Sequence, residues 1–327
     1  MFEKLVLVTR KTRLDGLIER FNTRGQAKFY LQQAGLDFAD YEREHDTYSR
    51  SLEKTRSEVE GLGLKLQLLD RAVVPTYLFA ETDLVLALGQ DGLVANTAKY
   101  VGAQPLIGVN PDVERFDGVL LPWRVEHVRR AVEATLAGKA KVREVTLAEA
   151  VLSDGQRLLG FNDIFIGAKT HVSAHYRLRV ARPRPPASSK KAYEKMKHDE
   201  EQVWLRHSSS GVIVSTGAGS TGWLSSVCAM ASAVAGALGG KAVDRVSMRW
   251  EDPRLFYVVR EPFASRHSSA EGAVGFLEQG ARLELESLMP TGGVIFSDGM
   301  EADALSFTSG LVARIGPAAQ RARLVVA

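Results

Sequence analysis

Short apolar runs alternate with longer amphipathic segments over the first 140 residues of the chain. The apolar runs predict strands, and the segments between them repeat their apolar positions at helical spacing. In the last of these segments Val125, Val128, Val132 and Leu136 fall on one helical face. The expected strands are 5–8, 64–69, 83–88 and 106–109; the expected helices are 14–35, 41–59, one ending near 101 and 124–137, with a short helix or turn at 73–79. This alternation predicts a parallel sheet covered by helices.

The pattern changes after residue 141, where short strand-like segments dominate. They lie at 142–147, 157–166, 176–180, 202–205, 245–250, 255–259, 281–285, 294–297 and 311–315. Such a density of short strands predicts an antiparallel sandwich or layered sheet. We therefore expect two domains in a chain of 327 residues, an α/β domain over 1–140 and a β-rich domain over 141–327.

A stretch without formal charge separates Arg206 from Lys241. Its strand pattern at 212–214 runs directly into the glycine-rich segment 217–222, and a helix-compatible segment of Ala and Ser follows. Glycines allow a tight turn and a close approach to a ligand, and the start of a helix offers unpaired N–H groups to anions. Further donors are the hydroxyls of Ser215, Thr216, Ser220 and Thr221. The segment predicts a site for a phosphorylated nucleotide, and a plain strand-to-helix connection is the alternative.

The apolar part of this stretch, 223–238, is interrupted by serines and is shorter than the roughly 20 residues of a membrane span. We expect a buried helix packed through small residues, with Cys228, the only cysteine, as an inert buried thiol. A single cysteine excludes an intrachain disulfide. The composition, with 45% hydrophobic and 25% charged residues and a net charge of +3, is that of an ordinary globular protein. It favours neither a nucleic-acid nor a membrane partner, and the first residues resemble no targeting signal, so a cytoplasmic location is expected.

A second glycine loop, Gly89-Gln90-Asp91-Gly92, follows the apolar strand 83–88. In open α/β sheets, ligands bind at the carboxyl ends of the strands. A carboxylate placed there could take a proton from an attacking hydroxyl or hold Mg²⁺ near phosphates. The alternative is that Asp91 caps the next helix while the glycines form the turn.

Three further segments carry candidate chemistry. Asn162 and Asp163 interrupt an apolar run, where a polar pair needs hydrogen-bond partners, as in ribose binding or a structural role. The segment Ser297-Asp298-Gly299 is typical of a hairpin turn. The segment 182–206 is rich in Pro, then Lys; a solvated loop or hairpin tip is the plain interpretation, and a contact to a phosphate is the other.

The order of these motifs resembles that in the NAD kinase family, whose hallmarks are a Gly-Gly-Asp-Gly loop, an Asn-Glu pair and a Thr-Gly-Ser-Thr loop. The variant seen here is most similar to the divergent branch that includes mitochondrial-type NAD kinases. The similarity extends over nearly the whole chain. The matching features are Ile107-Gly-Val-Asn110-Pro, Phe161-Asn-Asp-Ile-Phe-Ile-Gly167, Ser210-Gly211 and Thr216-Gly-Ala-Gly219.

The resemblance implies a Rossmann-like N-terminal domain, a C-terminal β-sandwich domain and an active site between them. It also implies transfer of the ATP γ-phosphoryl group to the 2′-hydroxyl of the NAD adenosine ribose, with Mg²⁺ as cofactor and a homodimer or larger homo-oligomer. Asp91 would be the general base. The other implied ligand-binding residues are Gly89, Gln90 and Gly92 for the donor phosphates, Asn162 and Asp163 for ribose or nicotinamide groups, Thr216, Gly217, Gly219, Ser220 and Thr221 for NAD and phosphate, and Gly222 and Trp223 near the adenine.

The chain departs from the family pattern at Gln90 for glycine, Leu93 for threonine, Asp163 for glutamate, Ser210 for aspartate and Gly217-Ala218 for Pro-Thr. Three alternatives stay open: a sensor that binds NAD(P) without turnover, a related kinase for a lipid or sugar, and a dinucleotide-dependent oxidoreductase. The last would need an acidic residue about 20 positions beyond the glycines within a βαβ unit. The next acidic residue is Asp244, and a β-rich pattern follows it.

Overall fold

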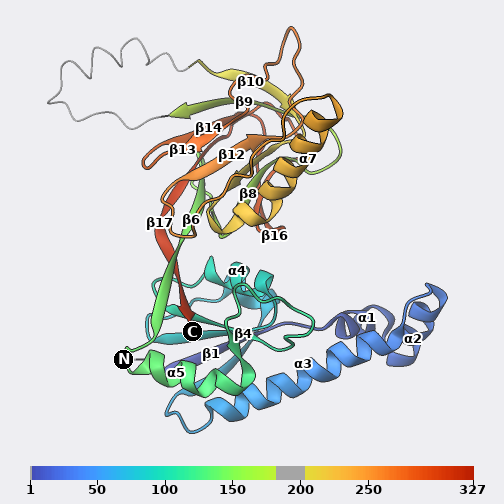
Figure 1. Cartoon of the computed structure of the whole chain (residues 1–327), viewed down its shortest axis with the longest axis vertical. Coiled ribbons are helices and arrows are strands. Elements are labelled where there is room, and N and C mark those ends of the chain that lie inside the picture. Colours follow the sequence, from blue (N-terminus) through green and yellow to red (C-terminus); the bar gives the residue numbers. More distant parts are fainter. Residues whose placement is uncertain (1, 182–202) are drawn as a thin grey trace, which may run out of the picture. The chain divides into compact units, whose positions relative to one another are not determined.

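The computed structural model describes residues 2–181 and 203–327, which form two compact units (Figure 1). Unit 1 comprises Met1–Glu144 and Ala322–Ala327, and unit 2 comprises Val145–Arg321. The sequence placed one boundary at 140/141 and assigned the whole remainder to the second domain. The last six residues instead belong to unit 1, because Arg323 and Leu324 pair with a strand there. The segment 182–202, with most of the basic segment, lies outside the described residues.

Unit 1 is built on a parallel sheet in the order β2-β1-β3-β4. These strands are β1 (Lys4–Thr9), β2 (Lys65–Asp70), β3 (Asp83–Leu88) and β4 (Pro105–Asn110), and all four were predicted. The end of β17 (Val312–Val326) and the short β5 (Trp123–Arg124) pair with β4, also in parallel. Every residue of β3 and β4 is buried, as expected of strands covered on both faces.

Helices cover both faces of this sheet (Figure 1). One face packs against α3 (Phe38–Val59) and α5 (Val128–Leu136) through a shared apolar core. The other carries α4 (Asp91–Ala98), which contacts the 3₁₀ turn η1 (Arg71–Thr76). A second 3₁₀ turn, η2 (Val125–His127), leads into α5.

The helix expected over 14–35 is two helices, α1 (Arg13–Phe21) and α2 (Arg24–Gln33). Asn22 ends α1 in the left-handed conformation, with φ of 65°, and the hydroxyl of Thr23 caps the start of α2. The apolar spacing alone did not reveal this break, because asparagine and threonine fit a helical pattern but prefer turns and caps.

Unit 2 contains two layers of strands with one core between them. One layer is the antiparallel set β10-β9-β14-β17, with β6 and β7 paired beside it. The other is the six-stranded sheet β13-β12-β11-β8-β15-β16. The strands of the first layer are β6 (Lys141–Leu152), β7 (Arg157–Gly160), β9 (Ala174–Ala181), β10 (Leu205–Ser209) and β14 (Arg282–Ser287), with β17. Those of the second are β8 (Asp163–Ala168), β11 (Val212–Ser215), β12 (Leu255–Val259), β13 (Val274–Leu277), β15 (Gly293–Ser297) and β16 (Met300–Ser306). The fold is therefore the expected α/β unit with a β-rich second unit.

Several sequence expectations for unit 2 were wrong in detail. The segment 245–250 forms no strand, and β13 and β16 were not expected. The run 157–166 is two strands, β7 and β8, because Phe161 and Asn162 form a turn between them. The helix expected to be buried is α7 (Trp223–Ala237), and only Leu224 and Cys228 of it are buried. Within the described residues, no helix is long and apolar enough to cross a membrane.

Candidate active site

Asp91 lies at the first position of α4, shortly beyond the end of β3. Its Oδ1 accepts a hydrogen bond of 2.6 Å from the backbone N–H of Leu120. The N-cap residue of α4 is Gln90, whose side chain makes no capping bond. Asp91 is therefore tied to a neighbouring loop rather than to the helix that it begins, and it is only half-buried. The carboxylate stands at the carboxyl edge of the parallel sheet, next to free helix N–H groups.

The two glycines of this loop have different surroundings. A Cβ at Gly89 would come within 2.7 Å of Cδ2 of Leu93, so a larger residue there would require the Leu93 side chain to shift. Gly92 is exposed, and a Cβ on it would meet nothing within 4 Å. No internal contact explains a glycine at position 92, where alanine would favour the helix by about 1 kcal/mol. The open backbone at Gly92 is the part of this loop that a ligand can approach.

A buried network of hydrogen bonds joins α3 to the ends of β1 and β3, directly before the 89–92 loop. The Tyr48 hydroxyl donates to the carbonyl of Leu88 at 3.1 Å and accepts from the backbone N–H of Arg10 at 2.9 Å. The Arg10 guanidinium binds Glu44 at 3.1 Å, and both side chains are more than nine-tenths buried. Burial raises the pKa of the Tyr48 hydroxyl, so it stays protonated and can donate to Leu88. Tyr48 on α3 therefore fixes the last residue of β3, directly before Gly89.

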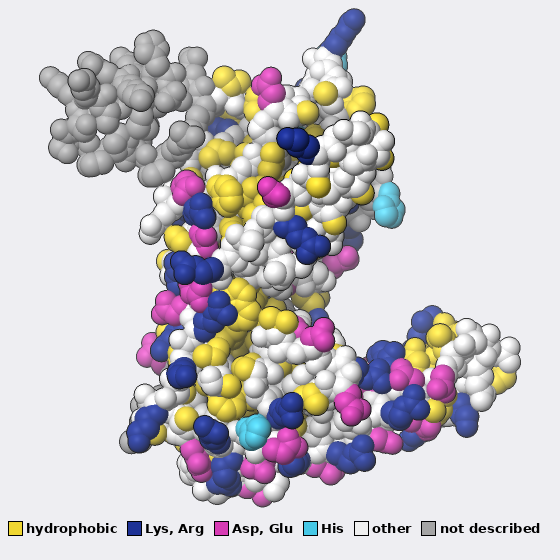
Figure 2. All heavy atoms as spheres, in the orientation of Figure 1, with side chains coloured by type: hydrophobic (Ala, Val, Ile, Leu, Met, Phe, Trp, Pro, Cys, Tyr) yellow, Lys and Arg dark blue, Asp and Glu magenta, His cyan; other side chains and the backbone are white. Residues whose placement is uncertain are grey.

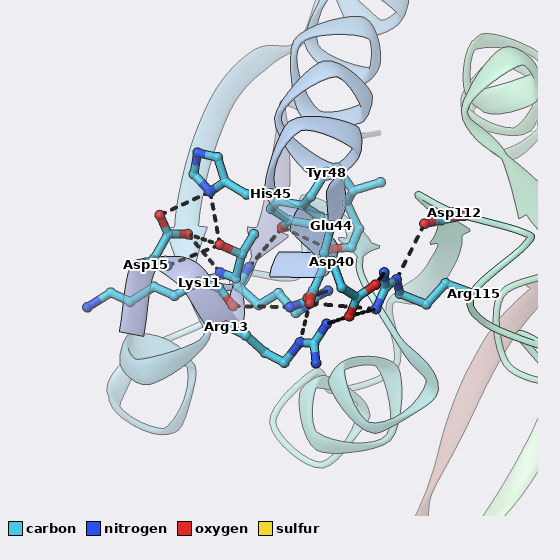
Figure 3. A network of polar contacts seen from close by, with 12 residues as sticks. Lys11, Arg13, Asp15, Asp40, Glu44, His45, Tyr48, Asp112 and Arg115 are labelled. Carbon is cyan, nitrogen blue, oxygen red and sulfur yellow. Dashed lines mark hydrogen bonds and ion pairs between the residues drawn. The ribbon is translucent and has the colours of Figure 1, made fainter. Parts of the chain in front are cut away.

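The same network extends to the surface through alternating charges (Figure 3). Arg13 contacts both Glu44 and Asp40, and Arg115 binds Asp40 at 2.6 Å. The hydrogen bonds from Arg115 and Arg13 hold the pKa of Asp40 well below its usual range. Burial tends to raise the pKa of Glu44, but the hydrogen bonds from Arg13 and Arg10 lower it overall. Both acids are therefore ionised at neutral pH, and they join α3 to the segments that follow β1 and β4.

In unit 2, the turn between β7 and β8 is held by a residue far along the chain. The Asp298 carboxylate accepts hydrogen bonds from the backbone N–H groups of Phe161 at 2.9 Å and Asn162 at 2.6 Å. Asp298 and Gly299, with φ of 54° and 68°, form the two-residue turn between β15 and β16. The predicted hairpin turn is confirmed, and its geometry is that of the Asp-Gly turns that favour hairpins.

The 216–223 loop is anchored on this turn. Thr216 donates its backbone N–H to the carbonyl of Asn162 at 2.9 Å, and its hydroxyl donates to the carbonyl of Phe161 at 2.6 Å. The hydroxyl also accepts from the N–H of Gly219 at 3.2 Å. Thr216 is fully buried, so its hydroxyl serves the loop itself. The Asn162 side chain is half-buried and makes no hydrogen bond within the described parts of the chain, so it is available to a ligand.

Gly217 and Gly219 are needed for contacts within the chain. A Cβ at Gly217 would overlap the carbonyl oxygen of Arg249, and one at Gly219 would overlap the carbonyl oxygen of Asn162. The Ser220 hydroxyl donates to the carbonyl of Gly217 at 2.8 Å and is buried. These glycines let the loop pack against neighbouring backbone, a role that the sequence could not separate from close approach to a ligand.

The accessible part of the loop is its second half. The 3₁₀ turn η3 (Ala218–Thr221) ends at Gly222, where α7 begins, and both Thr221 and Gly222 are exposed. Trp223 is stacked on Phe165 with ring centroids 5.6 Å apart, and the Arg260 guanidinium lies 5.4 Å from its ring centroid. Together these residues form an aromatic and cationic surface beside free helix N–H groups.

Asp163, the first residue of β8, is buried beside this surface. Burial, and secondly the negative charge of Asp298, raise its pKa from 3.8 to about 7. A buried carboxyl with a pKa near neutrality is typical of functional sites, where its charge depends on the ligand.

The structure therefore brings Asn162 and Asp163 together with the 216–223 loop inside unit 2, and it places the 89–92 loop in unit 1. The sequence did not assign roles to Asp298, Tyr48, Arg10 or Arg260. The Asp-Gly pair was a visible signal for Asp298, but only as a turn. Among the described residues, no group of three or more His, Cys, Asp or Glu could hold a metal ion.

Comparisons with known proteins point to one family. No protein-family model matches the chain. NAD kinase 2, mitochondrial, of Xenopus tropicalis is 23% identical over 343 residues, covering 84% of this chain and 80% of that protein. The human protein of the same name is 22% identical over 333 residues, covering 80% and 71%. Among solved structures, yeast NADH kinase complexed with NADH has a TM-score of 0.54 at 14% identity and covers all of this chain and 84% of that one. An NAD kinase from Archaeoglobus fulgidus in complex with ATP has a TM-score of 0.51 at 15% identity, covering 98% and 93%.

The two-unit fold, with a glycine-aspartate loop after a parallel strand and a second glycine-rich loop in a β-rich unit, is shared with solved NAD kinase and NADH kinase structures. Sequence relatives and structural neighbours agree on its family. Over most of its length the chain is similar to proteins named NAD kinase, at 22–23% sequence identity.

Proposed function

We propose that the chain is an NAD kinase, which transfers the γ-phosphoryl group of ATP to the 2′-hydroxyl of the NAD adenosine ribose. The observation that carries this proposal is the contact between the 216–223 loop and the turn before β8, which includes Phe161 and Asn162 and leads into Asp163 (below, the Asn162-Asp163 turn). Two motifs that are 54 residues apart join through Thr216 and form one surface with a free amide, a buried acid and a helix start. Phosphate and ribose hydroxyls are the groups that such a surface can bind.

In unit 2 we assign NAD binding to the accessible side chains. The Asn162 amide and the Asp163 carboxyl would bind ribose hydroxyls or nicotinamide-side groups. Thr221, Gly222 and Trp223 would line the phosphate site, with the free N–H groups at the start of α7 as donors; the N–H of Gly222 itself already donates to the carbonyl of Gly219 at 2.9 Å. The Trp223 ring would lie near the adenine. The remaining residues of the loop would maintain its conformation. The hydroxyls of Thr216 and Ser220 donate to backbone carbonyls within the chain, and Gly217 and Gly219 pack against neighbouring backbone.

In unit 1 we assign the chemistry to Asp91 as general base for the 2′-hydroxyl. Its Oδ1 accepts from Leu120, which leaves Oδ2 for the substrate proton. Gly89, Gln90 and Gly92 would line the donor-phosphate site. The phosphates would accept from the backbone N–H groups of Gln90 and Gly92 at the start of α4, because the N–H of Gly89 already donates to the carbonyl of Val109 at 3.2 Å. Gln90 is half-buried, and its side chain makes no capping hydrogen bond to α4. Mg²⁺ would enter with ATP and neutralise phosphate charge, with Asp91 as the nearest carboxylate of the loop.

The wider biological setting stays a prediction. The Xenopus tropicalis and human relatives are named as mitochondrial, whereas we propose a cytoplasmic location for this chain. A homodimer or larger homo-oligomer is likewise proposed from the family resemblance.

The test is a set of parallel assays with the purified full-length protein, Mg²⁺ and ATP or polyphosphate. NAD, NADH, a diacylglycerol and a hexose phosphate serve as acceptors, and phosphorylated product is identified by mass spectrometry. We expect product from NAD or NADH alone. Product from the lipid or the sugar would instead make it a related kinase. Binding of NAD in calorimetry without any product would make it a sensor.

A further inference from the structure

Asp298 connects two distant parts of unit 2. It lies 136 residues from Asn162, yet its carboxylate accepts the N–H groups of both Phe161 and Asn162. Its own backbone N–H donates to the carbonyl of Asp163 at 3.1 Å. Three hydrogen bonds from one residue therefore define the path of the chain through Phe161, Asn162 and Asp163.

The position of that turn is passed on to the glycine-rich loop. The carbonyl of Asn162 accepts from the N–H and the hydroxyl of Thr216, and it lies so close to Gly219 that a Cβ there would overlap it. A displacement of Asn162 would therefore displace the start of the loop that leads to Gly222 and Trp223. Because a carboxylate makes stronger hydrogen bonds to N–H groups than a neutral acceptor does, Asp298 suits this role.

We propose that Asp298 is a positioning residue for NAD: its carboxylate holds the Asn162-Asp163 turn, and through Thr216 the 216–223 loop, in the binding arrangement. The proposal rests on the proposed function of this site. Asp298 acts through Asn162 and Asp163 and needs no contact of its own with the ligand.

Asp298 also influences the charge state of Asp163. After burial, its negative charge is the second cause that raises the pKa of Asp163 to about 7. The neighbours of Asp163 on the adjacent strands are neutral. Ser215 on β11 pairs with Asp163, and Ser297 on β15 pairs with the next residue, Ile164. Loss of the charge at position 298 would therefore lower the pKa of Asp163, an effect distinct from any loss of shape.

Asp298→Asn tests the carboxylate while keeping the turn. Asparagine has nearly the same shape and, before glycine, is the most favoured residue for this turn, which requires positive φ. Its amide can accept only one of the two N–H groups well. Glu301→Gln on β16 is the matched control, because it also removes one negative charge and the side chain of Glu301 is exposed.

The measurements are amide hydrogen exchange at Phe161 and Asn162, and calorimetric NAD affinity from pH 5.5 to 8.5 in the absence of ATP. For Asp298→Asn we expect exchange at both amides to become at least about tenfold faster and NAD affinity at pH 8 to fall about 10- to 100-fold. The pH below which NAD affinity falls should also move to lower values. In Glu301→Gln all three quantities should match the wild type.

The outcomes separate the possible errors. Faster exchange with unchanged NAD affinity would overturn the positioning role and leave a merely structural one. Unchanged exchange would overturn the hydrogen-bond argument itself. Reduced NAD affinity in the variant, together with a wild type that binds NAD but forms no NADP, would support the positioning role and refute the kinase. A wild type that binds no NAD would overturn both.

Discussion

At Gly219 the backbone of the 216–223 loop lies directly against the carbonyl oxygen of Asn162, with no room for a Cβ. The contact is one of several by which the loop is attached to the Asn162-Asp163 turn. A methyl group at this position would separate two segments that must lie together for the proposed NAD site. Single residues in this region therefore have effects on stability and on binding that can be measured separately.

We predict that Gly219→Ala destabilises unit 2 by at least about 2 kcal/mol, because the new methyl group must displace backbone rather than a flexible side chain. Gly236→Ala is the control, since a Cβ at that position in α7 meets nothing within 4 Å. It should stabilise the helix by about 0.5–1 kcal/mol. Urea unfolding of the two variants measures both effects. Equal stability of the two variants would contradict the close packing at Gly219.

We predict that Asp163 makes the folded protein less stable as the pH rises. Its pKa is about 7 when folded but near 3.8 when unfolded, so the unfolded carboxyl loses its proton first. Stability is therefore lost between about pH 4 and pH 7 and falls no further above that range. The shift corresponds to roughly 4 kcal/mol as an upper value.

Comparison with Asp163→Asn isolates this effect, because asparagine does not ionise and the other titrating groups are shared. The free energy of unfolding of the variant, minus that of the wild type, should increase from pH 4 to pH 7. A difference that stays constant with pH would show that Asp163 has an ordinary pKa.

The residue types of the site were visible in the sequence, but many of their contacts were not. Asp298-Gly299 was correctly predicted to be a turn, because the pair prefers that geometry locally. Its bond to Asn162 depends on β8 and β15 lying side by side, which no local pattern encodes. Gly217 and Gly219 also contact backbone that is distant in the sequence, so the sequence alone could not distinguish a ligand-binding role from internal packing.

At the scale of elements, α4 joins the candidate phosphate loop to the sheet. The structure buries residues 93–98 of this helix entirely, between β3, β4 and η1. Only its first turn, with Asp91 and Gly92, reaches solvent. The N–H groups at the N-terminus of α4 are therefore accessible, while the rest of the helix is packed in the core.

We predict opposite effects of Gly92→Ala on stability and on ATP affinity. The new methyl group meets nothing in the folded chain, and alanine favours a helix, so stability should rise by about 0.5–1 kcal/mol. If donor phosphates approach this backbone, the same methyl group should weaken ATP binding about tenfold or more. Thermal unfolding and ATP titration measure the two quantities. A variant that is stabilised and binds ATP normally would remove Gly92 from the proposed site.

The helix α7 shows what the apolar pattern could not decide. The sequence correctly predicted a helix that starts after the glycine loop. The prediction that this helix is buried was wrong. Met230 and Val234 are at least half exposed, and Leu238 just beyond the helix is 83% exposed. A segment without charges has no polar face to indicate which side meets water, so its sequence alone gave no orientation. The surface of the molecule accordingly carries hydrophobic side chains among charged ones (Figure 2).

At the scale of the whole molecule, the chain returns to unit 1 at its end. Residues 323 and 324 of β17 extend the parallel sheet beside β4, and Val325 is fully buried in the core of that unit. Its carbonyl accepts a hydrogen bond of 3.0 Å from the indole N–H of Trp123. The sequence indicated strand structure only to residue 315. The rest was missed because glycine, proline and arginines interrupt the apolar pattern of β17.

We predict that Val325→Ala lowers the stability of unit 1 by about 2 kcal/mol, because it leaves a cavity in the core under β4. Val326→Ala, at a half-buried neighbouring position, should cost clearly less. Amide hydrogen exchange of β4 reports on unit 1 directly. Equal protection of β4 in both variants would mean that the final residues do not contribute to this core.

The most direct test of the account is NADP⁺ formation from NAD⁺, ATP and Mg²⁺ by the wild type, Asp91→Asn and Asp117→Asn. In Asp91→Asn the side-chain oxygen of the new asparagine could still accept from Leu120, so the fold should be kept while the base is lost. Asp117 is exposed and lies in the same region of the sequence, which makes it the matched control. We predict turnover by the wild type and by Asp117→Asn, and a loss of about 10²–10⁴-fold in Asp91→Asn. Turnover by Asp91→Asn at the wild-type rate would contradict the proposed mechanism, and no NADP⁺ from any of the three would contradict the kinase itself.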